Sequence, residues 1–125
     1  MDFEEVKALV EEHVDLIAVD GRAMAEARER CAAFLTVVAV LTDFKREIEV
    51  DKIKINTLTE IAYSDAISFA EGKTITEKKI HMVNDSKYTE QRDCLAEMEA
   101  LRDWVKKYIS IFENAHVTYR QMAQE

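Results

Sequence analysis

Residues 85–122 read DSKYTEQRDCLAEMEALRDWVKKYISIFENAHVTYRQM and contain the longest unbroken hydrophobic period in the chain. Apolar side chains recur there at alternating steps of four and three, the heptad spacing of one face of an α-helix. Trp104, Ile109 and Ile111 lie at the flanks and widen the apolar stripe. We therefore expect this helix to pack against more than one partner helix. The seam itself comprises Cys94, Met98, Leu101, Val105, Tyr108, Phe112, Ala115, Tyr119 and Met122.

The composition points to the same fold class. The 125 residues include only two Gly and no Pro, whereas 48% of the residues are hydrophobic. Tight hairpins and Gly-rich phosphate loops need Gly or Pro, so an all-β fold or a nucleotide-binding loop is disfavoured. The sequence predicts a single all-α domain over residues 1–125.

Two helices are expected in the first half of the chain. Asp2 followed by Glu5 has the form of a helix start, and a short amphipathic helix follows it. Asp20-Gly21 then breaks the chain, and a long helix is expected from about residue 21 to about residue 70. Alternating Ile and Val residues leave a β-hairpin near residues 46–57 as the alternative.

A short helix is expected between the two long ones. Gly72 ends the first long helix, and Thr74 with Glu77 forms a possible capping box for a short helix through Val83. Asn84-Asp85-Ser86 then breaks the chain before the last helix. The predicted architecture is a helical hairpin or bundle of two long and two short helices.

The apolar surface of the long helices predicts self-association. Residues 31–41 are apolar nearly all round, and the short N-terminal helix can only partly cover this segment, Trp104 and Ile111. A homo-oligomer would bury the remainder. The alternative is a compact monomeric four-helix bundle.

Charge and cysteine usage limit the classes of partner and location. The net charge of −8 disfavours general attraction to nucleic acid or to anionic membranes. Residues 31–41 are too few to span a bilayer, and a cytoplasmic protein is expected. Cys31 and Cys94 stand alone at apolar positions, which favours structural thiols over a disulfide or a redox pair.

No catalytic constellation is recognisable. His13, His81 and His116 lie far apart, and none begins a motif that would place two metal ligands on one helical face. Neither a nucleophile elbow nor a phosphate-binding loop is present. We expect no enzyme activity, no cofactor, no metal site and no small-molecule substrate.

A lysine-rich segment offers a possible contact with nucleic acid. Lysines beside an aromatic ring near a loop can hold phosphates while the ring stacks on a base. The alternative is that these lysines are solvated and balanced by neighbouring acids. The candidate residues for single-stranded DNA are Lys73, Lys78, Lys79, Lys52, Lys54 and Phe69.

Several features follow one another along the chain in an order that a known family shares: Asp20, Glu26-Ala27, Phe34, Phe69 before Gly72, Glu77-Lys78, Asp85, and the heptad-rich last helix with Leu95, Leu101, Asp103 and Trp104. This order resembles the UvsY-type recombination mediators of T-even phages. The resemblance implies a ring-shaped oligomer that binds single-stranded DNA and helps to load a recombinase. Ser64 and Ala66 stand where that family is expected to carry basic residues.

Two functional hypotheses follow. The first is a non-catalytic, phage-like recombination mediator that binds single-stranded DNA as an oligomer and assists recombinase loading. The alternative is an oligomeric structural or adaptor protein, in a virion or in regulation, that binds a protein partner through an acidic surface. The net charge favours the alternative.

Overall fold

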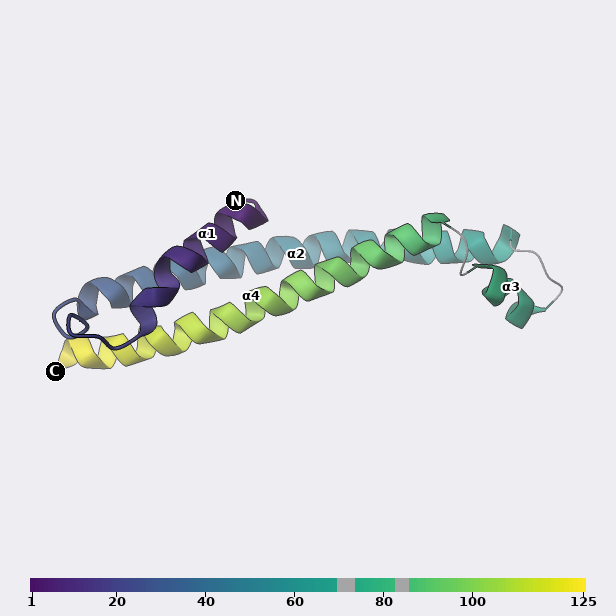
Figure 1. Ribbon diagram of the computed structural model, residues 1–125. Helices are drawn as coiled ribbons and strands as arrows, with labels where there is room; N and C mark the ends of the chain where they lie inside the picture. The colour runs from purple at the N-terminus through teal and green to yellow at the C-terminus, as the bar shows by residue number, and fades with distance from the viewer. Residues whose placement is uncertain (70–73, 83–85) are drawn as a thin grey trace. The chain divides into compact units, whose positions relative to one another are not determined.

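The computed structural model describes residues 1–69, 74–82 and 86–125, and every regular element in them is a helix (Figure 1). The elements are α1 (Phe3–Val14), the 3₁₀ helix η1 (Asp15–Ile17), α2 (Ala27–Phe69), α3 (Ile75–Met82) and α4 (Ser86–Gln124). The prediction of an all-α fold with two long and two short helices is confirmed.

Two helix starts follow from side-chain caps that the sequence predicted. The backbone N–H of Glu5 donates to Oδ1 of Asp2 at 2.9 Å, and the N–H of Glu77 donates to Oγ1 of Thr74 at 3.1 Å. Each cap satisfies a backbone donor that the first helical turn leaves without a partner. The predicted break at Asn84 and Asp85 lies outside the described residues.

The long helix begins later than the sequence predicted. Residues 21–26 form successive turns, and α2 starts at Ala27 rather than near residue 21. The carboxylate of Asp20 accepts from the N–H of Arg22 at 3.0 Å, and the Asp20 carbonyl accepts from the N–H of Ala23. This local bonding competes with the helical pattern and delays its onset.

The β-hairpin alternative for residues 46–57 is wrong, because the whole segment lies within α2. Its alternating Ile and Val residues are distributed around a helix: Ile48 is buried, whereas Val50 and Ile53 are exposed. No Gly or Pro interrupts the segment, so the helix continues through it.

The chain forms two compact units, and each contains part of both long helices. The first unit comprises Met1–Glu47 and Asp103–Glu125, and the second comprises Ile48–Arg102. The prediction of one domain over residues 1–125 stays a prediction.

The first unit has an aromatic core between α1, α2 and α4. The Phe34 ring lies 5.8 Å from Phe112 and 5.3 Å from Tyr119, and all three side chains are fully buried. The Phe3 ring of α1 meets Trp104 edge-on at 5.3 Å. Because aromatic side chains bury large areas, these contacts dock α1 onto the long helices.

The second unit buries smaller side chains. Ile48, Ala62 and Ala66 are its buried hydrophobic residues among those described. Tyr63 meets Tyr88 at a ring distance of 5.7 Å, which joins α2 to α4 within this unit. Across both units, no described helix is long and apolar enough to cross a membrane.

Candidate functional site

Arg30 is the buried charge around which the α1–α2 connection is organised. Its side chain is only 2% exposed, and Nη2 lies 3.1 Å from Oδ1 of Asp20 and 3.0 Å from Oε2 of Glu26. Nη1 donates to the Tyr119 hydroxyl at 3.1 Å and to the carbonyls of Leu16 and Ala18 at 3.3 Å. This set of partners satisfies a guanidinium that burial would otherwise penalise.

The pKa values follow from this geometry. The hydrogen bond to Tyr119, helped by Asp20 and Glu26, holds the pKa of Arg30 above its usual value. The hydrogen bond from Arg30, together with the Arg22 backbone N–H, lowers the pKa of Asp20 below 3.8. Both groups are therefore charged at neutral pH. The network has a structural role, because it fixes the chain that carries α1.

Cys31 and His116 form a second contact between α2 and α4. His116 Nδ1 lies 3.0 Å from the Cys31 carbonyl oxygen and 3.3 Å from Sγ. Both side chains are half-buried, and Cys31 and Cys94 are free thiols. No cluster of three or more His, Cys, Asp or Glu side chains within the described ranges could hold a metal ion.

The outer face of α1 is acidic. Val6 and Val10 are buried, which turns Glu4, Glu11 and the side chains near them towards solvent. At 100° per residue, the exposed acids share one side of the helix. Lys7 is the only Lys or Arg between residues 2 and 15. The acidic α1 face comprises Glu4, Glu5, Glu11, Glu12 and Asp15, the last of which caps α1 and begins η1.

Helix stability does not account for the acids at the end of α1. Glu4 and Glu5 lie in the first turn, where a negative charge complements the helix dipole. Glu11, Glu12 and Asp15 lie at the opposite end, where a negative charge costs about 0.3–1 kcal/mol. Asp15 is also three and four residues from Glu12 and Glu11, spacings at which like charges destabilise a helix.

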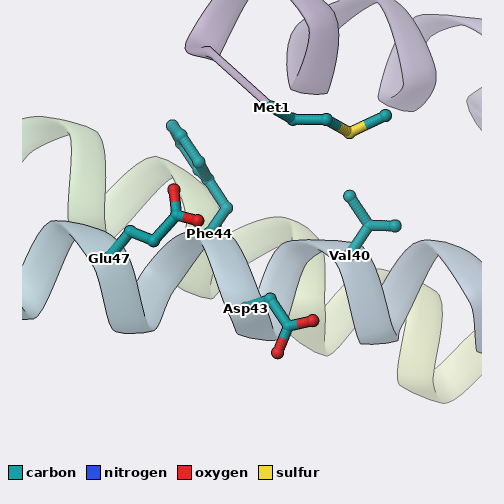
Figure 2. A pocket seen from close by; sticks show the side chains of 5 residues that line it. All are labelled: Met1, Val40, Asp43, Phe44 and Glu47. Carbon is teal, nitrogen blue, oxygen red and sulfur yellow. The ribbon is translucent and has the colours of Figure 1, made fainter.

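A small hollow of about 200 Å³ in the first unit is lined by Met1, Val40, Asp43, Phe44 and Glu47 (Figure 2). Figure 2 shows Met1 above α2, on the same side as the side chains of Val40 and Phe44. Asp43 forms an ion pair with Arg46, whose Nη1 lies 3.4 Å from Oδ1 of Asp43. The hollow thus combines apolar walls with two carboxylates.

The structure separates two of the lysines proposed for DNA. Lys52 and Lys54 are two residues apart on α2, so their side chains diverge by about 200° around the helix. Lys52 is 24% exposed, and its Nζ lies 3.5 Å from Oε1 of Glu99, whereas Lys54 is exposed. The two lysines therefore cannot act on one phosphate.

Lys52 does belong to a polar hollow in the second unit. The hollow has a volume of about 540 Å³ and brings two cations together with two carboxylates. Its charge is balanced, which is weaker than the uniformly basic groove that strand binding favours. The lining residues are Glu49, Lys52, Ile53, Asn56, Glu99 and Arg102.

Some of the residues predicted to contact DNA lie outside the part of the chain that the structure describes. Lys73 belongs to the residues that are not described, and the side chains of Phe69 and Lys79 are likewise outside the description. Lys78 is half-exposed on α3, where its backbone N–H donates to the Thr74 carbonyl. Contact between these residues and DNA stays a prediction.

The hydrophobic seam of α4, a candidate for both the core and the oligomer interface, is divided between the two units. Val105, Phe112 and Tyr119 are buried in the first unit, where Phe34 of α2 contacts Phe112 and Tyr119. Ala115 is buried there too. The remaining residues of the seam and its flanks are half-buried: Cys94, Met98 and Leu101 in the second unit, and Trp104, Tyr108, Ile109, Ile111 and Met122 in the first. Much of the seam is thus used within the chain.

Comparison with known proteins provides no further identification. No model of a protein family matches the chain, and neither the curated proteins nor the solved structures gave a match. The resemblance to UvsY-type mediators consequently stays a prediction from sequence.

Proposed function

We propose that the protein is a non-catalytic helical adaptor that binds a basic protein partner through the acidic α1 face. The observation that carries the proposal is the placement of Glu11, Glu12 and Asp15 at the end of α1, where they destabilise the helix. A positively charged partner would offset the cost of these acids, because complementary charges across an interface attract each other.

The neighbouring structure supports this assignment. Phe3 packs the start of α1 on Trp104, and Arg30 holds the segment that follows α1 through the carbonyls of Leu16 and Ala18. The acids are therefore presented on a helix that is fixed at both ends. A preorganised surface binds with a smaller entropy cost than a flexible acidic tail. The adaptor is expected to be cytoplasmic and to self-associate.

The test is fluorescence anisotropy of a labelled peptide rich in lysine and arginine, titrated with the protein at low and at moderate salt. Glu11→Lys with Glu12→Lys should weaken binding at least tenfold, because repulsion replaces attraction. The same double variant should fold at least as stably as the wild type, since lysine at the end of a helix complements the dipole.

A matched control distinguishes the loss of the acidic α1 face from the change in the net charge of the protein. Glu60→Lys with Glu97→Lys changes the net charge equally at exposed positions of the second unit. This control should retain most of the affinity. Equal weakening by both double variants would show a non-specific charge effect and would overturn the assignment to α1.

A second candidate is the DNA recombination mediator suggested by the resemblance. The observation in its favour is the hollow of the second unit, where Lys52, Asn56 and Arg102 could contact a phosphate. The lysines proposed from the sequence are tested separately from this hollow: for a mediator, changing Lys73, Lys78 and Lys79 together to Ala should weaken binding to a single-stranded oligonucleotide and flatten its salt dependence. Unchanged affinity in a folded variant would exclude those three lysines as DNA contacts.

A further inference from the structure

One exposed stripe on α2 in the second unit is complementary to itself. It consists of Lys54, Leu58, Ile61 and Asp65, at steps of four, three and four. This spacing places the four side chains on one side of the helix. All four are exposed, and Leu58 and Ile61 are each 51% exposed. We call this set the outer stripe.

The distribution of apolar side chains shows that the outer stripe is unusual. Within the second unit, the large aliphatic side chains of Val50, Ile53, Leu58 and Ile61 on α2 are all about half exposed or more. Among the described side chains, the α2 positions buried in the same unit are Ile48, Ala62 and Ala66. Single exposed aliphatic residues are ordinary, but Val50, Leu58 and Ile61 lie on one side of the helix, and a contiguous apolar strip marks an interaction surface.

The order of charges along the outer stripe indicates that a second copy of this chain can bind to it. The stripe begins with a cation, continues with two aliphatic residues and ends with an anion, and the spacing is the same in both directions. A two-fold axis between residues 59 and 60 would place Lys54 opposite Asp65 of a second copy. The same axis would place Leu58 against Ile61 of that copy. A parallel pair would instead place Lys54 beside Lys54.

We propose that two copies of this chain associate antiparallel through the outer stripe. The inference rests on the self-association expected of the adaptor, and it assigns that self-association to the outer stripe. Two chains of net charge −8 repel each other over most of their surface, whereas the stripe itself is neutral. Among the described residues, neither Lys54 nor Asp65 has an ion-pair partner, so both are available to a second copy.

The length of the outer stripe limits the affinity that we expect for the dimer. From Lys54 to Asp65 the helix rises about 16 Å. One helical face of that length covers less than the roughly 800 Å² per partner of a standard interface, even when Val50 extends it by one turn. The dimer is therefore weak, with a dissociation constant of roughly 10–100 µM, and it forms as the protein is concentrated.

Sedimentation velocity of the full chain over a range of concentrations tests the proposal. The wild type should show a monomer–dimer equilibrium. Lys54→Glu and Asp65→Lys should each raise the dissociation constant about tenfold, because each creates two like-charge contacts across the axis. The double variant should regain wild-type association, since the exchanged charges are again complementary.

Mixing the two single variants gives an independent readout of the antiparallel register. A chain with Lys54→Glu and a chain with Asp65→Lys form two opposite-charge pairs with each other but none with themselves. The mixture should therefore dimerise when neither variant does so alone. Lys106→Glu and Glu60→Lys carry the same charge changes at other exposed positions and should leave the equilibrium unchanged.

The proposal is overturned if the wild type stays monomeric up to about 1 mM, or if neither the double variant nor the mixture restores association. It is also overturned if the control variants weaken the dimer as much as the stripe variants do. Circular dichroism of each variant separates loss of association from loss of folding. Peptide binding by α1 is measured separately, so failure of the dimer and failure of the adaptor are distinguishable.

Discussion

Arg30 donates a hydrogen bond from Nη1 to the hydroxyl of Tyr119 at 3.1 Å, and this contact joins the start of α2 to the end of α4. The Tyr119 hydroxyl in turn donates to the carbonyl of Ala18 at 2.9 Å, in the segment that follows α1. The two bonds tie three separate parts of the first unit together. They hold the chain that carries the acidic α1 face.

Removing the hydroxyl of Tyr119 should destabilise the protein. Tyr119→Phe leaves the buried guanidinium of Arg30 and the Ala18 carbonyl each without one partner, which should cost about 1–3 kcal/mol. Urea denaturation monitored by circular dichroism measures this loss. Tyr63→Phe is the matched control, because the Tyr63 hydroxyl makes no hydrogen bond to the described residues, and this substitution should change stability little. Equal effects of the two substitutions would contradict the role of the network.

Asp20 should make stability depend on pH in the acid range. Its pKa is lowered in the folded state by Arg30, so its contribution is fully present above the unfolded pKa of about 3.9. The contribution is lost as the pH falls through the lowered folded value. Asp20→Asn should therefore lower the melting temperature at pH 7, and the difference from wild type should shrink below about pH 4. A difference that stays constant down to pH 2 would contradict this linkage.

Two adjacent α2 residues should respond very differently to truncation. Phe34 is fully buried between Phe112 and Tyr119, so Phe34→Ala should cost about 3–5 kcal/mol. Leu35 is 54% exposed, and Leu35→Ala should cost less than about 0.5 kcal/mol. Chemical denaturation of both variants measures the difference. A large loss at Leu35 in dilute monomer would place α2 in a different register.

The fluorescence of Trp104 should report the docking of α1. It is the only tryptophan in the chain, and the Phe3 ring meets it edge-on at 5.3 Å. Phe3→Ala should expose the indole to water and shift its emission to longer wavelength. Val117→Ala, at an exposed position of α4, should leave the emission unchanged. An unaltered spectrum in the Phe3 variant would show that α1 does not depend on this contact.

The all-α fold could be predicted because its determinants are local. The heptad spacing from Cys94 to Met122 and the caps at Asp2 and Thr74 are visible in a single sequence. The late start of α2 was not visible in this way. It depends on Asp20, whose backbone and side-chain bonds hold residues 21–26 in turns, and whose carboxylate is also paired with Arg30.

The candidate sites were less predictable from the sequence. The order of charged residues along a chain does not show to which side of the folded protein each side chain points. Lys52 and Lys54 are close in sequence, but the helix turns them to different sides. Arg30 was missed, although it stands three residues after Ala27 and four before Phe34, a spacing that places it on the core-facing side of the helix. The acidic α1 face was also missed, although the spacing of Val6 and Val10 in the sequence already indicates which side of this helix is buried.

A direct comparison of the two partner classes tests the central claim. Labelled Lys/Arg-rich peptide and labelled single-stranded oligonucleotide of matched length would each be titrated with the wild-type protein at the same low salt concentration. The adaptor account predicts saturable binding of the peptide, loss of that binding with Glu11→Lys and Glu12→Lys, and no comparable affinity for the oligonucleotide. Tight, salt-sensitive binding of the oligonucleotide without binding of the peptide would contradict it and would favour the recombination mediator.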